Sequence, residues 1–249
     1  MKQNIYDDPV FYESYINLRD EGKGLNDVLE IPAFRSLLPN LLEKDVLDLG
    51  CGFGESCKWY VTHGARKVIG LDISDKMITR AKQTFNDERI EYINLPIEDF
   101  DFGPENFDLV LSSLAFHYVA DFRHLIDRIY SNLRPGGYMI FSQEHPVATA
   151  KKIPNGWVKD EKGTKLHWIL DDYSEEGIRE QKWFIGGVIK YHRTMSTILN
   201  TLIETGFNVL KVIEPTATED AEEKDESLKE ERRRPPFLIV KVQKPRAQV

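Results

Sequence analysis

Three closely spaced glycines stand in the run VLDLGCGFGES, residues 46–56, directly after apolar residues typical of a strand. Gly50, Gly52 and Gly54 leave the backbone without side chains, so a ligand can approach it closely. The backbone N–H groups at the start of a following helix would then face that ligand. The pattern predicts a nucleotide-type site, although a tight turn between a strand and a helix would use the same glycines.

A carboxylate further along the chain supports a nucleotide-type site. Asp72 ends the run VIGLD, eighteen residues after Gly54. An acid at the end of this strand can accept hydrogen bonds from both hydroxyls of a ribose. Capping of the following helix is the alternative, but Ser74 is better placed for that role. The glycines and Asp72 together predict an adenosine-containing ligand.

The spacing of the glycines separates two kinds of adenosine ligand. Dinucleotide sites carry the pattern GxGxxG, whose third glycine packs the helix on the strand. The loop of this chain has the pattern GxGxG instead, and Glu55 follows where it would repel a pyrophosphate. The loop therefore favours a ligand without phosphate and disfavours a nicotinamide-dependent oxidoreductase.

Three of the six histidines lie where a general base could reach a ligand. His117 follows the predicted fourth strand, His145 follows the fifth, and His192 stands in the run KYHRT before a late helix. Imidazole titrates near neutral pH, so each is a candidate base, and His192 is preferred. Packing or surface roles are the alternatives, and for His192 the alternative is a helix entry capped by Thr194.

Other polar side chains are candidates for binding a substrate. Tyr191 and Arg193 belong to the same run KYHRT, and Arg193 could bind an anionic group. Near the N-terminus, Tyr15 and Arg19 share one helical face with Tyr12. Packing on the sheet, with a solvated arginine, is the alternative for this face.

These side chains require a framework of alternating strands and helices. Five short apolar runs are typical of strands buried on both faces of a parallel sheet: residues 45–50, 67–73, 90–95, 107–113 and 137–143. Three helical runs lie between them: residues 55–65, 74–85 and 121–137. The alternation predicts an α/β fold with a doubly wound sheet.

The alternation stops after residue 143. Residues 144–193 hold three of the four tryptophans and form a predicted insertion. Tryptophan buries a large area and can stack on a planar or cationic ligand. The insertion is therefore expected to act as a lid over a substrate, and a small satellite core is the alternative.

Two more strands are predicted near the C-terminus. Residues 194–207 are expected to form a helix, followed by strands at 208–215 and 237–244. The polar link between these strands is too short to carry a crossover helix packed on the sheet, so the strands should pair antiparallel. The charged part of the link, residues 219–234, is expected to be a solvated helix or loop.

Composition limits the class of protein. The length of 249 residues suits one domain with an insertion, and a net charge of −8 argues against a general nucleic-acid binder. Two cysteines without a CxxC or histidine companion predict neither a disulfide framework nor a metal site, which favours a cytoplasmic location. No apolar run approaches the roughly 18 residues that span a bilayer. The oligomeric state stays open.

Four runs in combination resemble the successive motifs of class I S-adenosylmethionine-dependent methyltransferases. They are VLDLGCGFGES, VIGLDIS, LPIEDFDFGPENFDLVLSSLAFHYVADF and IYSNLRPGGYMIFSQEHP. The resemblance implies a single domain with a seven-stranded, mostly parallel sheet in the order 3-2-1-4-5-7-6, in which strand 7 is antiparallel. Its expected parts are an N-terminal helical cap (1–43), a cofactor-binding core (44–143), the insertion after strand 5 (144–193) and a C-terminal helix with strands 6 and 7 (194–249).

The resemblance also implies roles for residues near the cofactor's methionine and ribose. Gly50, Cys51 and Gly52 would hold the methionine part, with Asp48 supporting their loop. Asp72 would bind the ribose.

The adenine and the reacting sulfur have their own expected partners. Ile73 and Ile97 would pack on opposite sides of the adenine. Many relatives carry an acid where this chain has Pro96, so Glu98 is the expected partner of the adenine amine. Ser112, together with the next serine, would face the reacting sulfonium.

The implied activity is in-line transfer of a methyl group from S-adenosylmethionine to a small molecule, leaving S-adenosylhomocysteine. Positioning of the reactants can supply about 7–11 kcal/mol of such a barrier. A hydroxyl or ammonium acceptor would also need a base. A cofactor-binding sensor without catalysis, and a tRNA or protein methyltransferase, are the alternatives. The chain lacks the Asp/Asn-Pro-Pro-aromatic run of DNA adenine methylases at the end of the fourth strand.

Overall fold

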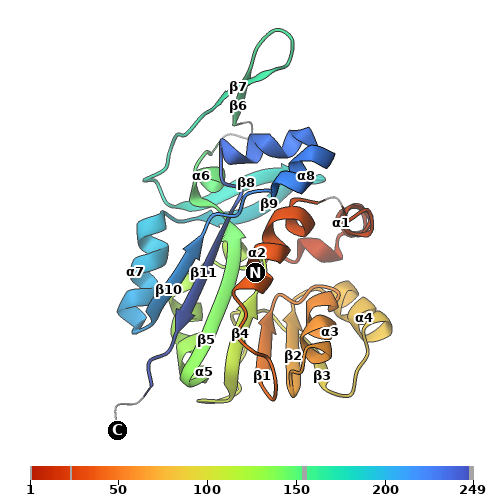
Figure 1. Ribbon diagram of the computed structural model, residues 1–249, viewed down its shortest axis with the longest axis vertical. Coiled ribbons are helices and arrows are strands. Elements are labelled where there is room, and N and C mark those ends of the chain that lie inside the picture. Colours follow the sequence, from red (N-terminus) through yellow and green to blue (C-terminus); the bar gives the residue numbers. More distant parts are fainter. Residues whose placement is uncertain (1, 23, 153–155, 247–249) are drawn as a thin grey trace.

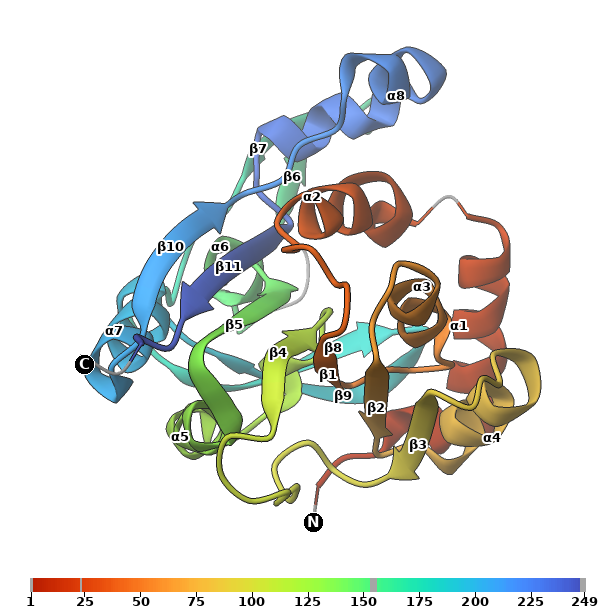
Figure 2. The same ribbon diagram turned by 60° about the horizontal axis from the view of Figure 1, so that its bottom comes forward.

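A seven-stranded sheet forms the centre of the computed structural model, which describes residues 2–22, 24–152 and 156–246. Its order is β10-β11-β5-β4-β1-β2-β3, and β11 runs antiparallel to both neighbours (Figures 1 and 2). The strands are β1 Asp45–Leu49, β2 Lys67–Asp72, β3 Ile90–Asn94, β4 Phe107–Ser112, β5 Leu133–Glu144, β10 Asn208–Ile213 and β11 Phe237–Gln243. The predicted order is confirmed, with β10 as strand 6 and β11 as strand 7.

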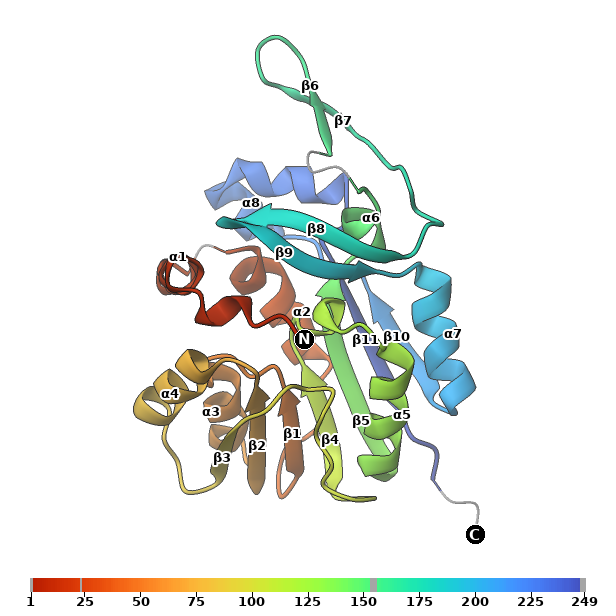
Figure 3. The ribbon, with the colours of Figure 1, turned by 180° about the vertical axis from the view of Figure 1, so that it is seen from behind.

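Helices cover both faces of this sheet. One face carries α2 (Ile31–Ser36), α3 (Glu55–Thr62) and α4 (Asp75–Thr84), and the other carries α5 (Phe122–Asn132) and α7 (Met195–Thr205) (Figures 2 and 3). The helix starts follow from their capping residues. Ser74, Asp121 and Thr194 accept backbone N–H groups at the starts of α4, α5 and α7.

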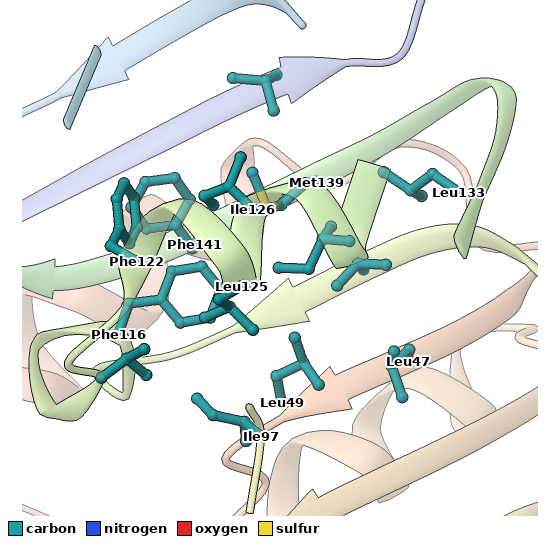
Figure 4. Packing of buried hydrophobic residues seen from close by; sticks show 14 of the residues in the cluster. Leu47, Leu49, Ile97, Phe116, Phe122, Leu125, Ile126, Leu133, Met139 and Phe141 are labelled. Carbon is teal, nitrogen blue, oxygen red and sulfur yellow. The ribbon is translucent and has the colours of Figure 1, made fainter. Parts of the chain in front are cut away.

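The core follows the two-residue period of the strands. On β1, Val46 packs under the helices of one face and Leu47 under those of the other. Figure 4 shows the larger cluster, in which Phe116 and Phe141 stack with ring centroids 4.9 Å apart. These rings anchor the segment that follows β4 to the sheet.

The N-terminal cap crosses the carboxyl edge of the parallel strands (Figures 1 and 3). It contains a 3₁₀ turn at Ile5–Asp7, helix α1 at Pro9–Asp20, a π-helical turn at Asn26–Glu30, and α2. The Asp7 carboxylate accepts hydrogen bonds from the Ser74 hydroxyl and the Lys76 backbone N–H, at 2.5 and 3.1 Å. The cap is thus fixed to the start of α4, where a carboxylate also complements the helix dipole.

The insertion after β5 forms one short helix, α6 (Pro146–Thr149), and two hairpins. The hairpin β6–β7 (Trp157–Lys159 and Lys165–Trp168) projects from the molecule, whereas β8–β9 (Gly177–Trp183 and Ile185–His192) lies over the carboxyl edge of the sheet beside α1 (Figure 3). Trp183 packs edge-on against Phe11, with centroids 5.3 Å apart. The hairpin and the cap therefore form one continuous roof.

The charged run near the C-terminus is helical, which is one of its two expected forms. It forms α8 (Glu219–Lys224) and a 3₁₀ segment at Glu226–Arg232. Leu228 is 5% exposed and packs with Leu29 of the cap, so this run is not fully solvated. A single leucine among charged residues gave no periodic signal for this contact.

We predict that Gly50→Ala destabilises the fold by about 2–4 kcal/mol. Gly50 has φ +79°, and an added Cβ would lie 2.6 Å from the Ala115 Cβ, so backbone strain and overpacking add. The matched control is Gly103→Ala, where φ is the same but the added Cβ would lie 3.6 Å from its nearest neighbour, the Asn106 amide nitrogen. It should cost about 1–2 kcal/mol from strain alone. Urea unfolding measures both, and equal losses would show that the approach of Ala115 is not a constraint.

Candidate functional site

A cavity of about 1580 Å³ lies between the carboxyl edge of the sheet and the roof formed by the cap and β8–β9. Its floor comes from the β1–α3 loop, the end of β2 and the segments after β3 and β4. Its roof includes Tyr6, Tyr15 and Trp183. Ligands of open α/β sheets bind at this edge.

The glycine loop lies at the bottom of the cavity. The Gly50 and Cys51 N–H groups both donate to the Leu71 carbonyl, at 2.8 and 2.9 Å, which ties the loop to β2. Gly52 has φ +54°, and an added Cβ there would meet nothing within 4 Å. Since Gly52 also lines the cavity, its missing side chain leaves open space for a ligand.

Asp72 joins the glycine loop to the end of β2. One carboxylate oxygen accepts the Gly52 N–H and the other accepts the Ser74 N–H, each at 2.9 Å. Each oxygen keeps a lone pair for a further donor. Burial raises the pKa of Asp72 to about 6. This acceptor on the cavity wall fits the two hydroxyls of a ribose.

Asp48 lies deeper, behind the glycine loop. It is 2% exposed, lines the cavity, and accepts the Cys57 thiol at 3.3 Å. Burial, with a smaller contribution from the charge of Asp72, raises the pKa of Asp48 to about 7. The cavity wall is therefore acidic, which suits a cationic ligand such as a sulfonium bearing an α-ammonium.

The residues expected around the adenine also reach the cavity. Ile73, Ile97 and Glu98 all line it. Glu98 lies 3.9 Å from the Lys2 ammonium. Apolar side chains next to a polar one are what an adenine ring with its exocyclic amine requires, so the residues present fit the cofactor.

Ser112 is not brought to the cavity. Its side chain is completely buried, and its hydroxyl donates to the Leu49 carbonyl at 2.7 Å. The next residue, Ser113, does line the cavity and donates to Glu30 at 3.0 Å. Because successive strand side chains point to opposite faces, the two serines cannot share one role.

His192, the preferred base, faces away from the cavity. It is 1% exposed; its Nδ1 lies 2.8 Å from the Thr149 hydroxyl and its Nε2 lies 2.9 Å from the Tyr173 carbonyl. The carbonyl requires an N–H on Nε2, so Nδ1 accepts the hydroxyl proton. Both nitrogens are thus used, and His192 does not line the cavity, so it is not positioned to act as the base.

His145 is also occupied. Its Nδ1 accepts the Val147 N–H as the cap of α6, and its Nε2 lies 2.8 Å from the Glu214 carboxylate. It does not line the cavity.

His117, the last of the three candidates, does line the cavity. Its Nδ1 accepts the Glu144 N–H at 3.4 Å, which leaves the proton of the neutral ring on Nε2. Burial lowers the pKa of His117 to about 4. The ring is therefore neutral at pH 7 and offers an N–H donor rather than a free base.

Of the four residues expected to bind a substrate, three line the cavity and one does not. Tyr15, Arg19 and Tyr191 line the cavity. Arg19 forms ion pairs with Asp27 and Glu55, at 2.9 and 3.1 Å.

Arg193 does not line the cavity. It is 7% exposed, and its guanidinium donates to the backbone carbonyls of Val119 and Ala120 and lies over the Phe122 ring. It fixes the segment before α5 instead of binding an anion.

Strand alternation explains these outcomes. Val188, Lys190 and His192 are buried on one side of β9, whereas Ile189 and Tyr191 face the cavity. Two glycines near the start of β9, Gly186 and Gly187, interrupt the alternation of side chains, so the sequence carries little sign of this two-residue period.

Several cavity residues had no local signal in the sequence. Tyr6 and Tyr118 place their hydroxyls 3.4 Å apart. Glu144 forms an ion pair with Lys190, which also donates to Gln181 at 3.1 Å. For Glu144, the position at the end of a buried strand, in SQEH, was the one sequence feature that could have indicated a cavity residue.

The described residues contain no group of three or more His, Cys, Asp or Glu placed to hold a metal ion. They also contain no helix that is long and apolar enough to cross a membrane.

Comparisons with known proteins agree with this geometry. A family model described as a methyltransferase domain matches residues 47–141. An uncharacterized protein of Haemophilus influenzae is 39% identical over 249 residues, which is 98% of each chain.

Two solved structures match most of the chain. A candidate S-adenosylmethionine-dependent methyltransferase of Listeria monocytogenes is 39% identical, with a TM-score of 0.83 over 92% of this chain and 99% of that one. A Mesorhizobium loti S-adenosylmethionine-dependent methyltransferase is 40% identical, with a TM-score of 0.82 over 88% of this chain and 100% of that one. With the confirmed sheet order and the glycine loop beside Asp72, these matches show that the chain belongs to the class I S-adenosylmethionine-dependent methyltransferases.

Proposed function

We propose that the methyl acceptor of this enzyme is a small molecule held inside the roofed cavity. This proposal rests mainly on the cavity and its volume of about 1580 Å³. Pockets for one ligand typically measure about 300–1,000 Å³, so this one has room for the cofactor and a second molecule. The cap and β8–β9 close over it, and a folded macromolecule would instead need an open surface.

The cofactor half of the proposal uses the floor of the cavity. Gly50, Cys51 and Gly52 hold the methionine part and Asp48 supports their loop. Asp72 holds the ribose through the oxygens that already accept two backbone N–H groups.

The same half includes the adenine. Ile73 and Ile97 pack on the ring, and Glu98 accepts its amine. All three line one end of the cavity.

The acceptor half lies under the roof. Tyr6, Tyr15, Tyr118 and Trp183 lie close together, and the Tyr6 ring meets the rings of Tyr15 and Tyr118 edge-on. Burial raises the pKa of Tyr15 to about 12, so this phenol stays protonated and can donate a hydrogen bond. Such an aromatic group fits a planar or cationic acceptor.

The chemistry then depends mainly on position. The cofactor, when bound, supplies an already activated methyl group. The chain contributes alignment, exclusion of water by the roof, and donors such as the His117 N–H and the tyrosine hydroxyls. Preorganised donors in a dry cavity act more strongly than in water.

Labelled S-adenosylmethionine tests the substrate class. The protein is incubated with a cell extract divided by ultrafiltration into metabolites and macromolecules. With the wild type we expect label in the metabolite fraction. With the Asp72→Asn variant we expect no label when the cofactor concentration is limiting. Transfer confined to tRNA or protein would contradict the proposal.

Asp72→Asn should weaken cofactor binding by about 10- to 10³-fold. The charged acceptor of two hydroxyls is lost, and hydrogen bonds to charged groups are worth about 1.5–3 kcal/mol each. In the wild type, affinity should also fall as the pH drops below about 6, where Asp72 becomes protonated. Calorimetry with S-adenosylhomocysteine measures both effects. Unchanged affinity in a folded variant would remove Asp72 from the ribose site.

His192→Ala should reduce stability without changing cofactor affinity. It removes the donor of the Tyr173 carbonyl and leaves the Thr149 hydroxyl only the Pro146 carbonyl at 3.4 Å, at a cost of about 1–3 kcal/mol. Burial lowers the pKa of His192. Below about pH 6.5 the unfolded chain therefore binds more protons at this histidine than the folded chain does, so the wild-type free energy of unfolding decreases as the pH is lowered. Urea unfolding at pH 5.5 and 7.5 should show a smaller pH effect in the variant. The exposed His124→Ala is the control, and equal effects in both variants would contradict this role.

A further inference from the structure

A completely buried carboxyl lies directly behind the cavity wall. Glu30 ends the π-helical turn Asn26–Glu30 and is 0% exposed. Its Oε1 accepts hydrogen bonds from two hydroxyls, Ser113 at 3.0 Å and Ser142. Ser113 itself lines the cavity. One hydroxyl therefore connects the carboxylate to the space in which the ligands bind.

The surroundings of Glu30 do not neutralise it directly. Its Oε2 is buried without a hydrogen-bond partner, and the ion pairs among the described residues leave Glu30 out. Charged and titratable groups act on it from a distance: Arg19 of α1, Arg35 of α2, Asp48 of β1, Tyr15 of α1 and Tyr60 of α3. Burial outweighs the two arginines and raises the pKa of Glu30.

Four other acidic groups at the cavity already have hydrogen-bond or ion-pair partners, among them Asp48, which accepts the Cys57 thiol. Asp72 accepts two backbone N–H groups, Glu144 pairs with Lys190, and Glu55 pairs with Arg19. His117 presents an N–H. Glu30 combines a carboxylate without a bound cation and a hydroxyl path to the cavity, which is the arrangement of a proton acceptor.

We propose that Glu30 takes up the proton that the methyl acceptor loses, and that the Ser113 hydroxyl relays it. The inference rests on the proposed small-molecule function. Ser113 is the group that meets the acceptor, and Glu30 acts through it.

The step is balanced in atoms and charge. The acceptor's lone pair forms the bond to the methyl carbon, and the carbon–sulfur bond breaks with its electrons left on sulfur. The acceptor proton moves to the Ser113 oxygen as the Ser113 proton moves to Glu30 Oε1. A buried carboxylate and a sulfonium thereby become a carboxylic acid and a thioether, and Glu30 returns its proton to water when the products leave.

The electrostatics favour this order of events. A positive sulfonium nearby keeps Glu30 ionised, and the proton affinity of Glu30 rises as that charge disappears. Because Glu30 is completely buried, such coupling is stronger than in water.

A purely structural role for Glu30 is the competing explanation. The Ser142 hydroxyl also accepts the Leu114 N–H at 3.0 Å, and Leu114 has φ +53°. Glu30 could then serve only to hold the segment after β4. Glu30→Gln separates the two roles, because glutamine keeps an oxygen for both hydroxyls but cannot take the proton.

Calorimetry with S-adenosylmethionine and S-adenosylhomocysteine, in phosphate and in Tris, gives the protons exchanged on binding. The two ligands differ by the sulfonium charge, so we expect the wild type to release up to about one proton more with S-adenosylmethionine near the pKa of Glu30. Glu30→Gln should reduce this difference, whereas Glu204→Gln, on exposed α7 surface, should not. An unchanged difference in Glu30→Gln would overturn the proposal. This result does not depend on which acceptor the enzyme uses.

The rate of methyl transfer is the second measurement, with the extract fraction that accepts the label used as the substrate. Glu30→Gln and Ser113→Ala should each lower methyl transfer about 10²–10⁴-fold, with the affinity for S-adenosylhomocysteine, which lacks the sulfonium charge, kept. Wild-type turnover should fall at acidic pH as Glu30 becomes protonated. If Glu30→Gln keeps normal turnover, Glu30 is a structural residue. Should Glu30→Gln fail to fold, normal turnover in Ser113→Ala would overturn the relay by itself.

Discussion

The Leu71 carbonyl, at the end of β2, accepts the N–H groups of both Gly50 and Cys51, and the site depends on this pair of hydrogen bonds. They hold the glycine loop against β2, so that the Gly52 N–H reaches Asp72. The chain must turn back sharply to do this, with φ +79° at Gly50. A glycine is required there for a second reason, because Ala115 of the neighbouring β4 segment occupies the place of a side chain. This backbone geometry thus positions three parts of the cavity floor: the glycine loop, the end of β2 and the segment after β4.

The wall after β4 is held from behind by polar groups as well as by the apolar packing of Phe116. Leu114 adopts a left-handed conformation, which costs about 1–2 kcal/mol for a residue with a Cβ. Its N–H is bound to Ser142, and Ser142 to Glu30. The N-terminal cap therefore does more than cover the cavity. Through Glu30 it fixes the segment that carries His117 and Tyr118 at the cavity.

Local signals predicted the framework well and the acceptor side poorly. Ser74, Asp121 and Gly206 mark helix ends through contacts within a few residues, and the apolar runs marked every strand of the central sheet. The Glu30 contacts, by contrast, join residues 83 and 112 positions apart, so no local pattern could reveal them. His192 was harder to place for another reason. Alternate side chains of β9 are buried, and His192 is one of them, whereas His117 does line the cavity.

The buried acids suggest how the fold separates binding from chemistry. Asp48, Asp72 and Glu30 all have pKa values raised by burial, and Asp48 interacts with both of the others. Without a ligand, this cluster lowers stability near neutral pH, because the folded state holds carboxylates that the unfolded chain would solvate. A bound cationic ligand offsets the repulsion among these three carboxylates, and this offset contributes part of the ligand's affinity. Once the sulfonium charge is lost, the attraction between these carboxylates and that charge is lost with it, and the product is held less tightly. The same three side chains can thus favour both the binding of the reactant and the release of the product.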